Sequence, residues 1–345
     1  MIDFRYHIVS LIAVFLALAV GVVLGAGPLQ GSIGDQLTVQ IESLRQEKEE
    51  LRVQLEQSQA RADELGTFVD ATSPQLLEGM LTGVDVAVVE SATADPAVTE
   101  ALLARISQAG GNVIGHVELT QRWVDPADAA LRDETSTTVA EQMLVPPDDG
   151  TATSQVLGIA LGQALTQRDP LTDEFTTAAT DFYTTLRESD LMAEVTAPAG
   201  PADVVLLVAP VTPADAEPDA SFLGIQVATA TGLAGTRTVV AGTDTGAADL
   251  LDAIRSNDDA AASVSTVDSV DYVSGQITTA LALTALSRDA GVGHYGTSPA
   301  ADSVLPAIPE LPEEETTEQA GDTDEGGAGE STDDSTEDSS EEATE

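Results

Sequence analysis

Hydrophobic positions near the start of the chain form one unbroken run. From Ile8 to Gly27 there is no charged side chain and only a single hydroxyl, that of Ser10. About 20 apolar residues is the length that a helix needs to cross the hydrocarbon core of a bilayer. We therefore predict a transmembrane helix over residues 8–27, after a short N-terminal segment of residues 1–7.

Basic residues around this run set its expected orientation. Arg5 precedes the run, and the next basic residue, Arg45, lies well beyond it. Because basic flanks stay in the cytoplasm, we expect residues 1–7 inside the cell and the bulk of the chain outside. A single helix of this kind favours the cell membrane over an outer membrane. A cleaved signal peptide is the alternative, but Leu24-Gly25-Ala26 is a poor cleavage site.

Small residues recur at every fourth position within the same run. They are Ala13, Ala17, Gly21 and Gly25, and the last two form a GxxxG pattern. A helix face of small residues lets two backbones approach closely in lipid. The pattern indicates self-association, although glycine is also simply common in membrane helices.

After an expected hinge from Gly25 to Gly34, the hydrophobic positions follow a seven-residue repeat. Its two seams are Leu37, Leu44, Leu51, Ser58 and Leu65, and Ile41, Lys48, Leu55 and Ala62. Apolar seams with charged flanks over about four heptads predict a coiled coil over residues 35–66, and hence a parallel homodimer. The candidate interaction residues are Leu37, Ile41, Leu44, Leu51 and Leu55, with Gly21 and Gly25 of the preceding helix. A lone amphipathic helix docked on its own domain is the alternative.

From residue 80 onward, continuous apolar runs alternate with helical patterns. Strands are predicted at 84–89, 112–119, 203–208, 236–241 and 262–267, and helices at 95–111, from 125, and at 153–166, 170–190, 246–255 and 268–286. Buried strands separated by helices predict a mainly parallel sheet with helices on both faces. The expected fold class is therefore α/β, with a Rossmann-like extracytoplasmic domain over residues 80–308.

Acidic residues dominate the composition, most strongly at the end of the chain. The net charge is −46, from 59 acidic and 13 basic residues, and residues 310–345 hold sixteen Asp or Glu and no Lys or Arg. That tail is too polar to bury a core, so we predict that it is disordered. Such a charge argues against nucleic acid and anionic lipid as partners. Because the chain has no cysteine, disulfides, thiolate ligands and cysteine nucleophiles are excluded.

Two segments resemble one protein family. The first spans Phe4 to Gly25, and the second is Gly293-His294-Tyr295-Gly296 with Ala300-Ala301-Asp302 and Leu305-Pro306. With the order of anchor, coiled coil, α/β body and acidic tail, they are similar to the actinobacterial MctB family. This resemblance implies a role in copper transport or copper homeostasis, including a pore. The related SteB-type proteins of corynebacteria imply instead septal cell-wall remodelling, through a coiled coil that engages a cell-wall hydrolase or its regulator.

Candidate chemistry is sparse. Copper(I) prefers thiolate or thioether ligands and copper(II) prefers imidazoles, yet the methionines are scattered and His7, His116 and His294 are far apart in sequence. We therefore expect no cofactor and no metal site, with His294 as the best single copper candidate. Asp244-Thr245-Gly246 matches an aspartic-protease triplet only once, and it is interpreted as a helix N-cap turn.

The sequence thus predicts a membrane-anchored, non-enzymatic scaffold of the cell envelope. It would act through its coiled coil and its α/β head on another envelope protein. A copper efflux channel or pore component is the alternative, and it needs the single apolar helix to oligomerise. An enzyme would need side chains to converge at the carboxyl edge of the sheet, near Glu90, Asp244 and Asp268. The sequence has no dinucleotide fingerprint, P-loop or nucleophile elbow to support one.

Overall fold

The structure of the protein is a computed structural model of the whole chain. It describes residues 4–26, 28–211, 219–243 and 249–309. The predicted acidic tail, residues 310–345, and the turn at Asp244-Thr245-Gly246 therefore lie outside the described residues.

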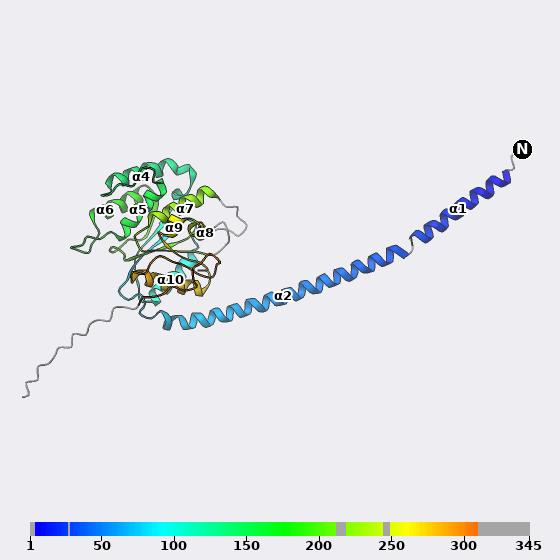
Figure 1. Cartoon of the computed structure of the whole chain (residues 1–345), viewed down its shortest axis with the longest axis horizontal. Helices are drawn as coiled ribbons and strands as arrows, with labels where there is room; N and C mark the ends of the chain where they lie inside the picture. The colour runs from blue at the N-terminus through cyan, green and yellow to red at the C-terminus, as the bar shows by residue number, and fades with distance from the viewer. Residues whose placement is uncertain (1–3, 27, 212–218, 244–248, 310–345) are drawn as a thin grey trace, which may run out of the picture. The chain divides into compact units, whose positions relative to one another are not determined.

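Two helices open the chain (Figure 1). Helix α1 runs from Phe4 to Ala26, and helix α2 runs from Pro28 to Leu77. The first confirms the apolar N-terminal helix, and the second contains the helix predicted over residues 35–66. The hinge expected from Gly25 to Gly34 is wrong over residues 28–34, which are helical. Proline suits the first position of a helix, where its missing N–H is not needed.

A seven-stranded sheet forms the centre of the head, residues 80–309. Its strands are β1 (Asp85–Glu90), β2 (Asn112–Leu119), β3 (Met192–Thr196), β4 (Val204–Val208), β5 (Thr238–Ala241), β6 (Ser265–Val267) and β7 (His294–Tyr295). The order in the sheet is β3-β2-β1-β4-β5-β6-β7, and every neighbouring pair is parallel except β2 and β3. The strand order reverses between β1 and β4, as in doubly wound α/β folds. The predicted α/β class with a mainly parallel sheet is confirmed.

Helices cover both faces of this sheet (Figure 1). They are α3 (Pro96–Gln108), α4 (Ala129–Gln142), α5 (Thr153–Thr166), α6 (Thr177–Glu188), α7 (Ala220–Gly232), α8 (Leu250–Arg255), α9 (Asp258–Ala261) and α10 (Val273–Ser287), with 3-10 turns η1 (Gln121–Trp123) and η2 (Pro126–Asp128). Helices α4 to α9 lie on one face, over a core that contains Trp123 and Phe182. Helices α3 and α10 and the end of α2 lie on the other face, over a core that contains Leu77 and Ile106. Alternate residues of β1 supply the two cores, because successive side chains of a strand point to opposite faces.

Helix boundaries in the head differ from the predictions in three places. The helix predicted over residues 170–190 begins only at Thr177, since Arg168 and Phe175 form a β-bridge before it. The helix predicted over residues 268–286 begins at Val273, because residues 268–270 bind neighbouring loops instead. The predicted start of the 246–255 helix lies outside the described residues, and helix α8 has Asp249 as its N-cap.

Five elements were not predicted: helices α7 and α9, the 3-10 turn η1, and strands β3 and β7. Helix α7 is apolar on most of its surface, so its sequence lacks a helical alternation of polar and apolar residues. Strand β3 is an edge strand whose side chains are mostly exposed, and strand β7 has only two residues. Each therefore lacks the buried apolar run by which the other strands were recognised.

Two glycines allow close packing of helices α5 and α7. A Cβ atom on Gly158 would lie 2.4 Å from the carbonyl oxygen of Thr229, and one on Gly232 would lie 2.3 Å from that of Gln155. Real Cβ atoms do not approach backbone oxygens this closely, so the crossing of these helices depends on glycine at both positions.

Arg105 of α3 fixes the C-terminal end of α2 to the head. Its guanidinium donates hydrogen bonds to the carboxylate of Asp70, to Ser73 Oγ at 2.8 Å and to Gln108 Oε1 at 3.1 Å. Ser73 is fully buried, and its hydroxyl also donates to Gln108 Oε1, at 2.9 Å. Residues 70–77 of α2 therefore belong to the fold of the head.

Candidate functional site

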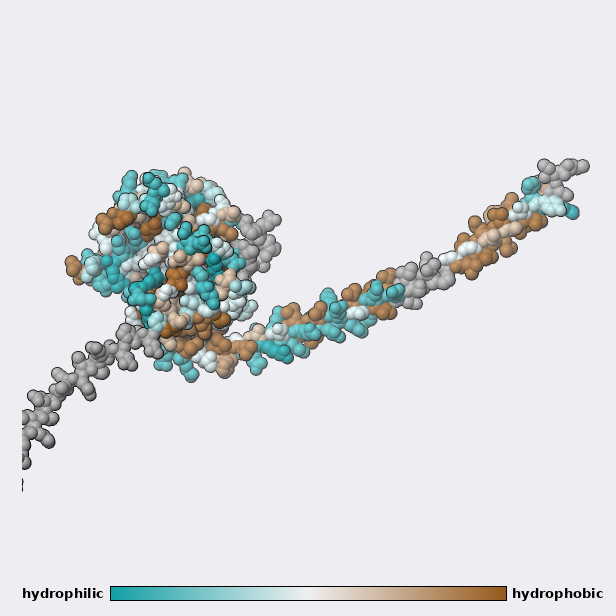
Figure 2. All heavy atoms as spheres, in the orientation of Figure 1, coloured by the Kyte–Doolittle hydropathy of each residue, from teal (hydrophilic) through white to brown (hydrophobic). Residues whose placement is uncertain are grey.

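The predicted seam of α2 is exposed in the single chain. Its apolar members, Leu37, Ile41, Leu44, Leu51 and Leu55, keep 48–63% of their accessible surface. Residues 36–65 are all classed as exposed, so no other described segment covers this stripe. Hydrophobic and hydrophilic side chains alternate along the helix (Figure 2). The structure confirms the helix and its exposed apolar stripe, and the coiled coil stays a prediction.

Helix α1 carries the other predicted interaction residues. It is long and apolar enough to cross a membrane over Phe4–Gly25, and hydrophobic side chains cover most of its length (Figure 2). A Cβ atom on Gly21 or Gly25 would meet nothing within 4 Å outside its own helix backbone. The GxxxG face is thus open to a second helix, and pairing through it stays a prediction.

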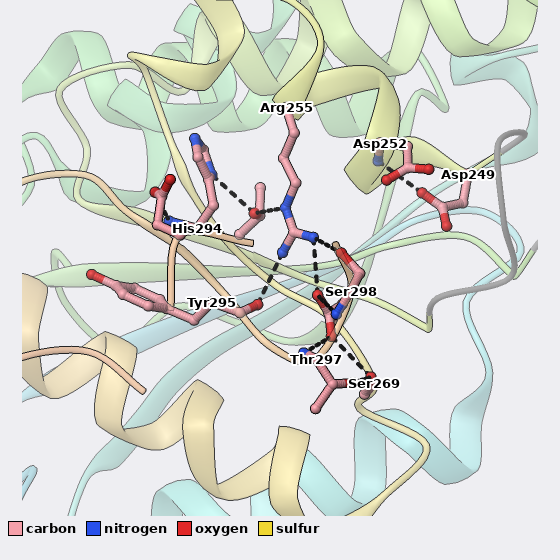
Figure 3. Close-up of polar contacts among 11 residues, drawn as sticks. Asp249, Asp252, Arg255, Ser269, His294, Tyr295, Thr297 and Ser298 are labelled. Carbon is pink, nitrogen blue, oxygen red and sulfur yellow. Dashed lines mark hydrogen bonds and ion pairs between the residues drawn. The ribbon is translucent and has the colours of Figure 1, made fainter. Parts of the chain in front are cut away.

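A second candidate site surrounds Asp268, which directly follows β6 (Figure 3). Its carboxylate accepts hydrogen bonds from the backbone N–H of Thr297 at 2.8 Å and of Ser298 at 3.3 Å, both in the loop after β7. It also accepts one from the Ser269 hydroxyl at 2.9 Å and one from Arg255 Nη1 at 2.9 Å. The side chains of Arg255 and Asp268 are only 3% and 1% exposed, so this is a fully buried ion pair.

Arg255, in the last turn of α8, joins three segments that are distant in sequence (Figure 3). Its Nε donates to Thr266 Oγ1 of β6 at 2.8 Å, and its Nη2 donates to the carbonyl of Tyr295 at 2.9 Å. Its Nη1 also donates to Ser298 Oγ at 2.7 Å. The loop that carries the Gly293–Gly296 motif is therefore tied to the sheet through one buried guanidinium.

Glycine is required where this loop passes Asp268. Gly296 has a φ of 136°, and a Cβ atom there would lie 2.0 Å from Asp268 Oδ1. Both the backbone conformation and the contact exclude a side chain. The structure therefore requires glycine at position 296, because the Asp268 carboxylate occupies the space of a side chain.

Hydrogen bonding keeps Asp268 ionised. Burial alone would raise the pKa of this carboxyl, but hydrogen bonds from the Thr297 N–H, Arg255 and Ser269 outweigh burial and hold the pKa below its ordinary value. Every oxygen of the carboxylate has partners within the chain, and no proton needs to leave or arrive near neutral pH. The cluster therefore positions the loop and offers no free acid, base or ligand.

His294, the best copper candidate from the sequence, is engaged by the same cluster. Its Nδ1 lies 3.0 Å from Thr266 Oγ1, and because Arg255 already donates to that oxygen, the Thr266 hydroxyl can donate its proton to the ring. Burial lowers the pKa of His294, which favours the neutral ring. Its Nδ1 is engaged by Thr266 within the chain, and among the described residues His294 belongs to no group of three His, Cys, Asp or Glu side chains that could hold a metal ion.

Glu90 and Asp268, two of the three residues at which an enzyme would need side chains to converge, lie apart in the structure. Glu90, at the end of β1, has its Oε1 2.8 Å from His116 Nε2 of β2, within hydrogen-bond distance. Asp268 follows β6, and strands β4 and β5 lie between, which separates the two carboxylates by roughly 14 Å at about 4.8 Å per strand. Asp244 lies outside the described residues. Within the ranges that the structure describes, no three His, Cys, Asp or Glu side chains could hold a metal ion together.

Arg255, which connects the segments of this cluster, was missed by sequence analysis, as were the hydroxyl residues around it. Its helix was predicted, but no spacing relates it to Tyr295 and Ser298, 40 and 43 positions later. The one signal in the sequence was that basic residues are rare, with 13 in the whole chain. An arginine shortly before a predicted buried strand therefore stands out.

Comparison with known proteins identifies relatives over nearly the whole length. The model of a family described as "Copper transport outer membrane protein, MctB" matches residues 1–306. Proteins named "Copper transporter MctB" from Mycobacterium tuberculosis and Mycobacterium bovis are each 33% identical over 328 residues, covering 88% of this chain and 99% of the relative. The protein of that name from Mycobacterium leprae is 31% identical over 336 residues, with the same coverage.

Proposed function

This chain belongs to the MctB family, and we propose that it is a membrane-anchored, non-enzymatic scaffold of the cell envelope that serves copper homeostasis indirectly. In this proposal α1 anchors the protein in the cell membrane with the N-terminus in the cytoplasm. Helix α2 pairs with a second copy and, with the head, recruits another envelope protein. The family description names an outer membrane, whereas one apolar helix suits the cell membrane, and the location is part of the proposal.

The exposed stripe on α2 is the observation that carries the scaffold proposal. Residues 36–61 form helix, and all of them remain exposed in the single chain. Most helical stability in proteins comes from packing of an apolar face, and isolated helices are marginal in water. Full burial of a leucine or isoleucine side chain gives about 1.5–3 kcal/mol, so covering five half-exposed ones on each helix of a pair is worth on the order of 10 kcal/mol. A helix with this surface needs a partner helix.

Polar interruptions in the seam favour an additional partner. Lys48 and Ser58 occupy seam positions, and polar residues there set register at a cost in stability. An envelope protein that engages this weaker stretch, such as a cell-wall hydrolase or its regulator, would connect the protein to septal remodelling. This finer role rests on the resemblance to SteB-type proteins and on the accessible seam.

The test is deletion of residues 36–66 from the full chain, with α1 joined to the rest of the protein. We expect the deletion to abolish recovery of envelope partners in a pull-down from cross-linked cells, while the fluorescence of buried Trp123 shows that the head still folds. A variant that replaces the exposed Glu64 by alanine is the control and should recover the same partners as the natural chain. Unchanged recovery by the deletion variant contradicts the scaffold proposal.

A copper efflux channel is the second candidate, favoured by the names of the relatives. It requires several copies of α1 to enclose a pore, although Ser10 is the single hydroxyl between Ile8 and Gly27. Purified protein in a planar bilayer separates the two functions. Copper-dependent conductance supports the channel. No conductance, together with recovery of copper resistance when a deletion strain receives the protein without α1, contradicts the channel.

A further inference from the structure

A groove lies where the C-terminal end of α2 meets the first turn of α10. It encloses about 530 Å³, and its lining includes Ala62, Leu65, Gly66, Val69, Tyr272 and Val273. Leu65 and Tyr272 remain 66% and 62% exposed. Hydrophobic side chains gather around this end of α2 (Figure 2). The lining is mainly apolar, and its size falls within the range of about 300–1,000 Å³ that is typical of binding clefts.

The groove continues the seam of α2. Ala62 and Val69 follow Leu55 at intervals of seven residues, and Leu65 follows Ser58 by seven. The exposed stripe therefore runs from Leu37 into the groove without a change of register. Gly66, which carries no side chain, lies beside the seam on the side of the head and widens the groove. A helix that packs along the stripe must reach Tyr272 of the head.

Charges beside the seam favour a second copy in parallel orientation. In a parallel coiled coil, the residue just before a position of the Ile41, Lys48, Leu55 seam lies opposite a residue of the partner helix that is five positions further along. That partner residue directly follows a position of the Leu37, Leu44, Leu51 seam. This rule places Glu47 of one copy opposite Arg52 of the other, an attractive pair that occurs twice by symmetry. The same rule places Phe68 of the second copy opposite position 73 of this chain, on the side of α2 that also carries Gly66 and faces the head.

We propose that the groove receives α2 of a second copy of this chain, and that Phe68 of the second copy packs against Tyr272. The inference rests on the pairing of α2 proposed above and extends that interface from the helix to the head. Phe68 is 66% exposed, so its own chain leaves it available. Because Arg105 fixes the end of α2 to the head, the groove is a preformed surface. Each head then contacts both helices of the pair.

The chain is suited to a cross-linking test because it has no natural cysteine. Two differently tagged full-length copies are co-expressed, one with Phe68→Cys and the other with Tyr272→Cys, and membranes are oxidised with diamide. Both side chains are exposed, so neither substitution disturbs a core. The matched control pairs Tyr272→Cys with Gln59→Cys, because Gln59 is also exposed and lies on the opposite side of the helix from Phe68. Leu44→Cys in a single copy reports pairing of the seam far from the head.

We expect a disulfide-linked pair of tags for positions 68 and 272 at least about tenfold stronger than for the control, together with a Leu44 homodisulfide. A Leu44 homodisulfide without the 68–272 product overturns the groove inference and leaves the pairing of α2 intact. Absence of both products overturns the pairing itself. In a second measurement, Tyr272→Asp should weaken dimerisation of detergent-solubilised protein about tenfold or more, since one contact between aromatic rings is lost on each side.

Discussion

Replacing Arg255 by methionine should destabilise the head more than any exposed charge substitution. Methionine fills similar space but leaves the Asp268 carboxylate buried without its charged partner. Removal of one member of a buried ion pair costs about 3–5 kcal/mol, because the remaining charge is neither solvated nor paired. The variant also loses the hydrogen bonds to Thr266, Tyr295 and Ser298, which anchor the loop after β7.

Urea unfolding of the full chain in detergent measures this loss. Trp123 is the single tryptophan and is fully buried in the core of the head, so its emission follows unfolding of the head alone. With a slope of about 3 kcal/mol per molar urea for a domain of this size, the unfolding midpoint should fall by about 1–1.7 M. Arg237→Met is the matched control, because the Arg237–Asp289 pair is exposed and should contribute less than about 1 kcal/mol. Equal midpoints for the two variants would refute the reasoning.

The loss of stability in Arg255→Met should depend on pH, because the Arg255–Asp268 pair contains a titratable carboxyl. The pKa of Asp268 is held below its ordinary value in the folded chain, so its contribution is present above the unfolded pKa of about 3.9 and is lost as pH falls through the folded pKa. In Arg255→Met, burial without the guanidinium should raise that pKa. The difference in stability between natural chain and variant should therefore shrink as pH is lowered from 7 toward 4. A difference that stays constant over this range would show that the lost energy comes from packing and not from charge.

Three further predictions concern other parts of the molecule. Gly158→Ala should cost about 1–3 kcal/mol or more by forcing helices α5 and α7 apart, whereas Gly224→Ala, with open space around it, should stabilise α7 slightly in the same urea assay. Arg105→Met should release the end of α2, seen as faster proteolysis at residues 66–77 with little change in Trp123 emission. His294→Gln should flatten the pH profile of stability: burial lowers the folded pKa of this ring, so the natural chain loses stability as pH falls below about 6.5, and the variant should not.

Long periodic segments were predictable from sequence because one pattern determines each of them. The apolar run in α1, the heptads in α2 and the helix at residues 153–166 all match the structure in type, and the last matches at both ends. Strand β2 was predicted with correct ends, since its apolar run is bounded by a glycine turn on one side and a polar turn on the other.

Elements that depend on distant residues were not predictable in the same way. Residues 268–272 have a composition that suits the start of a helix, yet Asp268 is fixed in an extended loop by Arg255 and by backbone groups of residues 297 and 298. Strand β7 is paired for only two residues and exists because that loop is tied down. The two candidate sites differ in the same way. The seam residues of α2 could be identified from their spacing, whereas the partners of His294 and Asp268 come from three segments that no spacing relates.

The length of helix α2 sets the distance between its N-terminal end and the head. Residues 28–69 of this helix precede the part that belongs to the head, so at about 1.5 Å per residue they give about 63 Å of helix before the head begins. Arg105 fixes the C-terminal end of α2 to the head. The number of residues in α2 therefore sets both the distance of the head along the helix axis and the rotation of the head about that axis. Adding seven residues would move the head by about 10 Å along the helix axis and turn it by about 20°, whereas adding four would move it by about 6 Å and turn it by about 40°.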